Sequence, residues 1–236
     1  MKVSIFNEHL HEKTDEQVRL AYPQGIHGAL AEPLIAEGAT VRCFTLDSVS
    51  DLTEDVLNDT DVMIWWGHMG HHLVPDEVAV RVKEAVLRGM GIIFLHSAHH
   101  SKPFRLLMGT SCNLTWREDG DMERIWNTSP AHPIAQGIGR YFTLPHVETY
   151  GEPFGIPQPD EVVFLGWYEG GEVFRSGCTF HRENGKIFYF QPGHETFPIF
   201  YDPNVKIIIR NAVKWAMPTY RVPALECPHV KRPDCE

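Results

Sequence analysis

Residues 61–99 read DVMIWWGHMGHHLVPDEVAVRVKEAVLRGMGIIFLHSAH, and this stretch decides the fold. Asp61–Trp66 and Gly91–Leu95 are short apolar runs of the kind that form buried strands. Between them, Asp76–Leu87 places most of its apolar residues on one helical face. Two strands joined through a helix normally pair in parallel. The stretch therefore predicts a parallel sheet covered by helices.

The alternation of strands and helices continues on both sides of this stretch. Toward the N-terminus, Lys2–Phe6 and Thr40–Thr45 are expected strands, and Gly25–Glu37 is the expected helix between them. Toward the C-terminus, further strands, two of them joined by an Asn-Gly turn at 184–185, precede a final helix at Asn204–Ala216. The fold class is therefore α/β with a mostly parallel sheet.

The pattern changes after Ser101, which can cap a helix that ends near Met108. Short strand-like runs interrupted by prolines and glycines follow. They predict an inserted, partly antiparallel lobe at about 111–160, within a single domain of residues 1–217. Residues 218–236 contain four prolines and are expected to form an extended tail.

Composition narrows the range of partners. A formal net charge of -10, without a block of Lys or Arg, argues against nucleic acid or an anionic membrane as the main partner. The expected substrate is small and not strongly anionic. No apolar run reaches the roughly 18 residues of a membrane span, and the first residues lack a signal-peptide core, so the expected compartment is the cytoplasm.

The cysteines do not form a framework. They are five in number and irregularly spaced, as expected for reduced thiols. In the tail, Cys227, His229 and Cys235 offer soft ligands for a structural ion or an intersubunit bridge, although their irregular spacing makes this a weak motif.

Histidines follow three of the expected strands. They are His68 and His71 after residues 61–66, His96 and His99 after residues 91–95, and His194 after residues 187–190. Ligands bind beyond the carboxyl ends of parallel strands, so these side chains can converge on one crevice. A metal or acid–base site is the leading hypothesis. A spacing of three residues can bring two imidazoles to one cation.

We therefore expect His68, His71 and His99 as metal ligands and His96 as a structural or supporting residue. Imidazoles with a carboxylate suit Zn, Mn, Ni or Fe, and zinc is the nominal choice. No nucleotide cofactor is expected. The alternative for His68 and His71 is that one of them only hydrogen-bonds the backbone, and for His194 that it closes the strand while Glu195 starts a helix.

Other residues are candidates for substrate contact. Glu148 and Tyr150 alternate on an expected strand, so both side chains point the same way, and Glu148 is a candidate metal ligand or general base. The alternative is a solvated strand residue. Six candidates for substrate contact are expected to bind hydroxyls, orient a carbonyl or support a sugar face; they are His11, His27, Trp66, Arg117, Tyr150 and Arg175. Trp65 and Trp116 are further candidates for a sugar platform, although buried tryptophans more often belong to the core.

Several short motifs occur in a specific order along residues 1–217. They include Trp65-Trp66-Gly67-His68, Leu95-His96-Ser97-Ala98-His99, Tyr150-Gly151-Glu152-Pro153-Phe154, Gly170-Gly171-Glu172-Val173-Phe174-Arg175 and Pro192-Gly193-His194-Glu195. In these motifs the chain resembles the trehalose-utilisation protein ThuA family. The resemblance implies a flavodoxin-like three-layer sandwich of the class I glutamine amidotransferase type.

The resemblance does not imply glutaminase chemistry. Catalytic members of that fold carry a Cys nucleophile in a sharp turn after a strand, whereas the corresponding turn here, Leu95-His96-Ser97-Ala98, has no cysteine. His194 and Glu195 occupy the chain position of those enzymes' His-Glu pair, so the resemblance implies a base and an orienting partner there.

The resemblance also implies a function. Similar proteins act in the catabolism of trehalose and related disaccharides, on 3-keto derivatives made by a partner sugar 3-dehydrogenase. Our leading expectation is a metal-dependent isomerase or epimerase with His194, Glu195 and Glu148 as catalytic residues and a homodimeric assembly. Two alternatives stay open: a hydrolase using Ser97 with His194 and Glu195, and a non-catalytic carbohydrate-binding or regulatory protein.

Overall fold

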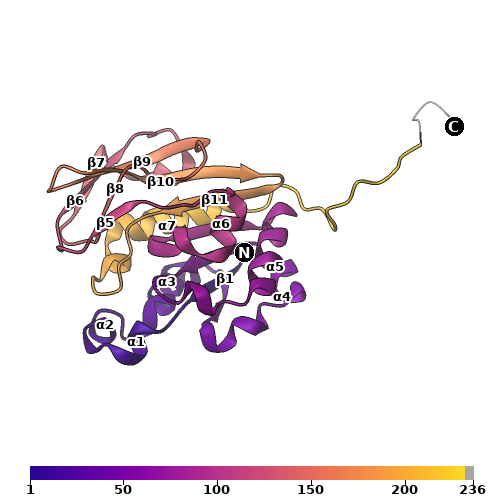
Figure 1. The fold of residues 1–236 in the computed structure, drawn as a ribbon, viewed down its shortest axis with the longest axis horizontal. Coiled ribbons are helices and arrows are strands. Elements are labelled where there is room, and N and C mark those ends of the chain that lie inside the picture. Colours follow the sequence, from indigo (N-terminus) through magenta and orange to yellow (C-terminus); the bar gives the residue numbers. More distant parts are fainter. Residues whose placement is uncertain (232–236) are drawn as a thin grey trace.

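The computed structural model describes residues 1–231 and has one large mixed sheet (Figure 1). Nine strands run in the order β2-β1-β3-β4-β11-β10-β9-β6-β7. Five neighbouring strands are parallel: β1 (Lys2–Asn7), β2 (Thr40–Phe44), β3 (Val62–Trp66), β4 (Gly91–Leu95) and β11 (Gly185–Phe190). Four antiparallel strands extend the sheet: β10 (Val173–Arg182), β9 (Glu161–Tyr168), β6 (Glu123–Asn127) and β7 (Tyr141–Leu144). The expected α/β class with a mostly parallel sheet is confirmed for the five-strand half, and the other half is antiparallel.

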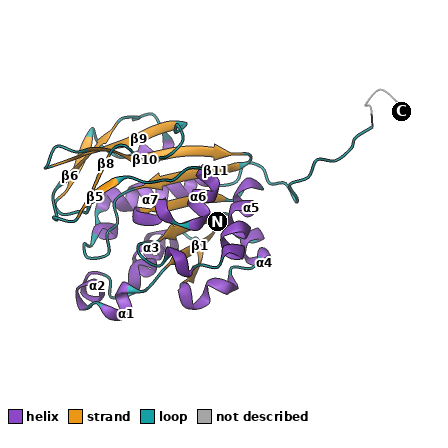
Figure 2. Ribbon diagram, viewed as in Figure 1, coloured by secondary structure: helices purple, strands orange, loops and turns teal. Residues whose placement is uncertain are grey.

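The helices form two groups beside the parallel strands (Figure 2). α3 (Gly25–Ala36) and α7 (Pro203–Ala216) pack against each other and against β1, β4 and β11. α4 (Glu54–Asn58), α5 (Asp76–Leu87) and α6 (Lys102–Met108) form the second group. Two short helices, α1 (His11–Thr14) and α2 (Glu16–Ala21), follow β1 and were not foreseen from the sequence. Within residues 1–231 there are also five 3₁₀ turns: Leu46–Asp51, His71–Leu73, His96–His100, Pro133–Ala135 and Ile199–Tyr201.

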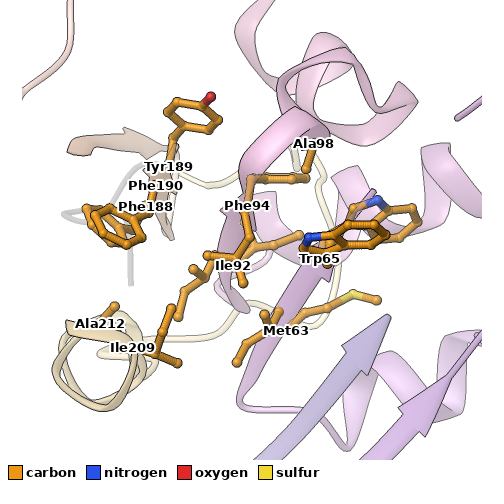
Figure 3. Packing of buried hydrophobic residues seen from close by; sticks show 14 of the residues in the cluster. Met63, Trp65, Ile92, Phe94, Ala98, Phe188, Tyr189, Phe190, Ile209 and Ala212 are labelled. Atoms are coloured by element: carbon orange, nitrogen blue, oxygen red, sulfur yellow. The ribbon is translucent and has the colours of Figure 1, made fainter. Parts of the chain in front are cut away.

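The core lies where α7 covers the centre of the sheet. Asp202 caps α7 by accepting hydrogen bonds from the backbone N–H groups of Asn204 and Val205. The buried face of the helix recurs every three or four residues, and Figure 3 shows its Ile209 and Ala212 beside the sheet residues Ile92 and Phe188. This packing ties α7 to the two strands, β4 and β11, that lie at the centre of the sheet.

A two-stranded ribbon lies beside the large sheet. β5 (Thr115–Arg117) pairs antiparallel with β8 (Thr149–Gly151), and Trp116 lies opposite Tyr150. The ribbon falls within the range expected for an inserted lobe. It brings residues 115–117 and 149–151 to the same end of the molecule as the carboxyl ends of the parallel strands, because Ser97 after β4 contacts Tyr150.

The chain ends in an extended segment. Val222 donates a backbone hydrogen bond to Arg88, after which residues 223–231 run away from the folded body (Figure 1). The cysteines described within residues 1–231 are free thiols, and Cys235 of the weak tail motif lies outside the described residues. Across residues 1–231, we find no helix with the length and apolar character needed to cross a membrane.

Candidate metal and substrate site

Four side chains from distant parts of the chain meet beyond the ends of the parallel strands. His68 follows β3, His96 follows β4, His194 follows β11 and Glu148 precedes β8. One donor atom from each of the four lies within 4.8 Å of the donor atoms of the other three. The strand ends thus bring imidazoles together as the sequence pattern predicted, but the histidines that meet are not all the expected ones.

The backbone aims His96 into this cluster. His96 adopts a left-handed conformation, with φ of 58°, immediately after β4. Its carbonyl accepts a hydrogen bond from the Tyr189 hydroxyl at 3.1 Å. Gly193 lies against it, and a Cβ atom at Gly193 would come within 3.2 Å of the His96 Cβ. The Trp66 indole holds that glycine by donating to its carbonyl at 2.9 Å. A strained residue held from several sides is typical of a functional turn.

Three members of the cluster have buried donor atoms without hydrogen-bond partners. Within residues 1–231 this holds for both ring nitrogens of His96, for Glu148 Oε2 and for His194 Nε2. His96 Nε2 lies 3.3 Å from Glu148 Oε2 without the geometry of a hydrogen bond. Buried polar atoms are normally paired, so a set of unpaired atoms that face one another calls for an explanation. Imidazole nitrogens and a carboxylate oxygen are the donors that a divalent transition metal accepts.

Supporting contacts orient two of the imidazoles. Glu195 Oε1 lies 2.9 Å from His68 Nδ1 and 3.5 Å from His11 Nδ1, which leaves the other ring nitrogen of His68 for the cluster. His194 Nδ1 bonds the Thr196 hydroxyl at 2.8 Å, which leaves its Nε2. A carboxylate behind a ligating histidine is the usual way in which proteins fix the ring.

Burial and neighbouring charges set the protonation of these groups. Burial and the nearby rings of His68 and His194 hold the pKa of His96 well below its usual range, so this ring is neutral and free to donate a lone pair. Burial raises the pKa of Glu148 to about 7. Burial opposes ionisation of Glu195 as well, but the hydrogen bond to His68 and the charges of the nearby imidazoles together outweigh that effect and lower the pKa of Glu195 to about 2. Burial lowers the pKa of His68, yet the same carboxylate raises it on balance.

A cavity of about 470 Å³ opens beside the cluster. His68 and Glu148 form part of its wall, so a molecule in the cavity would reach the cluster. Its other lining residues come mainly from the turn after β4 and from the β5/β8 ribbon: Met69, Ser97, His99, His100, Asn113, Leu114, Trp116, Glu118 and Tyr150. The volume is in the range of sites for small organic ligands.

Of the expected ligand set of His68, His71 and His99, the structure places His68 in the cluster and the other two outside it. His71 Nδ1 lies 3.1 Å from Glu8 Oε1, away from the cluster, because the loop after β3 turns its side chain toward β1. His99 lines the cavity, but its Nδ1 faces the carbonyl of His96 at 3.4 Å. The left-handed conformation of His96, with φ of 58°, sends its ring away from that of His99, although a spacing of three residues would otherwise align them. His96, expected to be a supporting residue, is the member of the pair in the cluster.

Five of the six residues expected to bind substrate do not line the cavity, and four of them are bonded elsewhere in the fold. Arg117 is held by Glu172, at 3.0 Å, and by Asp119 and Asp121. Arg175 is held by Glu152 at 2.7 Å. In both cases acidic neighbours satisfy the guanidinium. Trp66 is fully buried and braces Gly193, and His27 lies near β1; neither contributes to the cavity wall.

Among the remaining expected contacts, Tyr150 lines the cavity and His11 lies behind the cluster, against Glu195. Glu195 itself is buried and supports His68 from behind. Sequence reasoning passed over Glu118, which lines the cavity with its carboxylate 3.4 Å from His194 Nε2. Trp116-Arg117-Glu118 is one of the motifs in which the chain resembles the ThuA family, and this run is the signal that could have pointed to Glu118.

A second cluster joins His9, Glu12 and His27 near the end of β1. The Asn7 amide lies between them: its Nδ2 donates to Glu12 Oε1 at 2.7 Å and lies 3.1 Å from His27 Nδ1, while its Oδ1 accepts from the His9 backbone. His27 therefore accepts at Nδ1 and carries its proton on Nε2. A protonated Nε2 does not ligate a metal, so this cluster is better suited to hydrogen bonding.

Ser97 does not form a nucleophile pair in this structure. Its hydroxyl lies 2.6 Å from the Tyr150 hydroxyl, and within the described residues it has no hydrogen bond to His194. The hydrolase alternative required such a bond. Its geometric requirement is therefore not met.

The fold and site define a class: a mixed α/β protein with a cluster of histidines and a carboxylate at the carboxyl ends of its parallel strands. The sequence model of the ThuA family, described as trehalose utilisation, matches residues 2–216. The chain belongs to this family, and the resemblance seen in the motifs is confirmed. Membership supports a role related to carbohydrate metabolism. A comparison with curated proteins finds no match.

Solved structures with the same fold are distant in sequence. A ThuA-like protein from Parabacteroides merdae has a TM-score of 0.68 and 16% identity, over 94% of this chain and 92% of that one. A ThuA-like protein from Bacteroides uniformis has a TM-score of 0.64 and 15% identity, over 92% and 91%. A protein from Salmonella typhimurium, described as cytoplasmic, has a TM-score of 0.63 and 15% identity, over 92% and 100%. At these identities the similarity shows a shared fold.

Proposed function

We propose that the protein is a metal-dependent enzyme that isomerises or epimerises a keto-sugar derived from a disaccharide. The observation that carries the proposal is the meeting of three imidazoles and Glu148, with unpartnered buried donor atoms, beside a cavity. Membership of a family described by trehalose utilisation supports a carbohydrate substrate.

In this proposal His68, His96 and His194 hold the cation, with zinc as the nominal metal. Three protein ligands and one open position are typical of catalytic zinc. A cation bound there would polarise the carbonyl of the keto-sugar. Glu195 keeps the His68 ring in its ligating orientation.

Glu148 carries the proton, since its carboxylate lines the cavity next to the imidazoles. It removes the proton from the carbon beside the carbonyl, and the C–H electron pair becomes the C=C bond of an enediolate. Return of this proton to the other carbon, with transfer of the hydroxyl proton from the neighbouring oxygen to the former carbonyl oxygen, gives an isomer. Return of a proton to the same carbon from the opposite face, by solvent or a second acid on that face, gives an epimer. His194, expected from the sequence to be a base, becomes a ligand in this arrangement.

The test combines metal analysis with hydrogen exchange. The untagged wild-type protein is expected to contain near-stoichiometric metal and to introduce deuterium from heavy water into 3-keto-trehalose. His96→Ala should lose both the metal and the exchange. Glu148→Gln should keep the metal and lose the exchange, because it removes the proton carrier and leaves the three imidazoles.

His71→Ala is the matched control, because His71 lies near the cluster but pairs with Glu8. It should keep metal and exchange. Loss of metal in Glu148→Gln would make Glu148 a ligand. A wild-type protein without metal and without exchange would overturn the enzyme proposal in favour of carbohydrate binding without turnover.

The finer fold assignment is also a proposal. The parallel strand order β2-β1-β3-β4-β11 follows the 2-1-3-4-5 order of flavodoxin-like sheets, and the two helix groups support a three-layer sandwich of the class I glutamine amidotransferase type. A cytoplasmic location, a homodimer and a partner sugar 3-dehydrogenase that supplies the keto-sugar are proposed as well. The description of the Salmonella neighbour supports the location.

A further inference from the structure

The cavity has two chemically different regions. Its inner wall contains Glu148 and His68, which are polar and belong to the cluster. Trp116 and Met69 also line it, and each exposes 65% of its surface. A large exposed aromatic side chain at a cavity, in a protein whose Trp65 and Trp66 are fully buried, is a candidate contact for an apolar ligand face.

The ribbon holds Trp116 in a fixed relation to the cluster. Trp116 lies opposite Tyr150 in the antiparallel β5/β8 pair, so the two side chains share a face. Tyr150 is tied to the turn after β4 through Ser97 at 2.6 Å. Trp116 is therefore positioned by the same elements that position Glu148 and His96.

Arg117, the residue after Trp116, anchors the ribbon to neighbouring acidic side chains. Arg117 bonds Glu172 through two nitrogens, each at 3.0 Å, and Asp121 at 2.6 Å. Thr115 on the other side donates to the Gly151 carbonyl at 3.0 Å. These contacts fix the backbone that carries Trp116, so its indole can meet a ligand without a rearrangement of the ribbon.

We infer that Trp116 is a positioning residue for the second ring of a disaccharide, whose first ring lies at the His68–Glu148 end of the cavity. This inference rests on the proposed function for the identity of the reacting ring. The C–H face of a sugar is apolar and matches an indole, whereas its hydroxyls match the polar inner wall. The substrate class is therefore a two-ring glycoside.

Calorimetric binding with trehalose and glucose as probes tests the inference. Wild-type protein should bind trehalose about tenfold more tightly than glucose, in line with one aromatic contact. Trp116→Ala should remove this difference and leave glucose binding unchanged, and Trp116→Phe should keep most of it. Equal binding of both sugars by the wild-type protein, no binding of trehalose, or an unchanged preference in Trp116→Ala would overturn it.

Trp167→Ala is the matched control. Trp167 is also exposed, at 37%, but lies on β9, outside the cavity wall. It should retain the preference for trehalose. The measurement needs neither metal nor turnover. If the wild-type protein contains no metal but still prefers trehalose through Trp116, the enzyme proposal fails while this inference stands. Metal content should be unchanged in Trp116→Ala.

Discussion

At the scale of single residues, Glu123 is a buried titratable carboxyl outside the site. Its carboxyl lies inside the antiparallel half of the sheet, where Ser176 donates to it at 2.6 Å. Gly166 provides the space, because a Cβ atom there would meet Glu123 Oε1 at 2.2 Å. Burial raises the pKa of Glu123 to about 7, so the folded protein holds a neutral carboxyl at mildly acidic pH.

This burial predicts a pH-dependent contribution to stability. Between the ordinary pKa of 4.5 and the folded value of about 7, the folded protein binds more protons than the unfolded chain. The free energy of unfolding therefore falls as the pH rises through this window, by about 3 kcal/mol in total. Glu123→Gln keeps an acceptor for Ser176 and removes the titration. It should be about as stable as wild type at pH 5 and more stable at pH 8.

Urea unfolding of the two proteins at several pH values checks this expectation. Glu161→Gln serves as the control, because Glu161 is exposed at the start of β9. Its free energy of unfolding should differ little from that of wild type at every pH. If the difference in free energy of unfolding between wild type and Glu123→Gln does not grow with pH, Glu123 is not a buried neutral carboxyl.

At the scale of elements, the turn after β11 positions the site through Gly193. This residue has φ of 151°, and a Cβ atom there would approach the Phe200 ring at 2.7 Å and the His96 Cβ at 3.2 Å. Gly193→Ala should displace His96 from the cluster. We expect a stability loss of about 1–3 kcal/mol together with reduced metal content.

Gly171→Ala separates backbone strain from displacement of the site. Gly171 also has a positive φ, 97°, but has open space around it and lies in the β9–β10 turn. Its alanine variant should lose stability and keep its metal. Thermal unfolding and metal analysis of the two variants make the comparison. Full metal content in Gly193→Ala would mean that the turn does not position His96.

The elements also show what could be predicted from sequence. α5 and β4 begin and end at the expected residues, because an amphipathic period and a fully buried run are local signals. Ser101 caps α6 as expected. By contrast, α1 and α2 lack a strong period of their own, and the end of the sheet at β6 and β7 depends on pairing with distant strands.

At the scale of the whole molecule, the site depends on contacts between residues far apart in sequence. His68 and His194 were expected there because each follows a buried strand, and this reasoning remains valid at any separation. The choice between His96 and His99 depended on the φ angle of one turn residue, which no spacing rule reveals. Glu195 supports a histidine 127 residues earlier, a relation that only the folded chain defines.

Hydrogen bonds from the C-terminal segment to the folded body stop at Val222 within the described residues. Arg221 donates to the carbonyls of Asn58 and Thr60, and Val222 donates to that of Arg88, whereas residues 223–231 are exposed. Truncation after Val222 should therefore leave Tm unchanged. Truncation after Pro218 removes these hydrogen bonds and should cost about 2 kcal/mol, which lowers Tm by roughly 4–8 °C.

Thermal unfolding and sedimentation of the full chain and both truncations decide the role of this segment. If residues 223–236 only project into solvent, the longer truncation has the same Tm and the same mass in solution as the full chain. If they lie across a neighbouring subunit, the longer truncation dissociates and loses Tm in a manner that depends on protein concentration. That second result would contradict the expectation that residues after Val222 do not contribute to stability. It would mean instead that these segments join two subunits in a dimer.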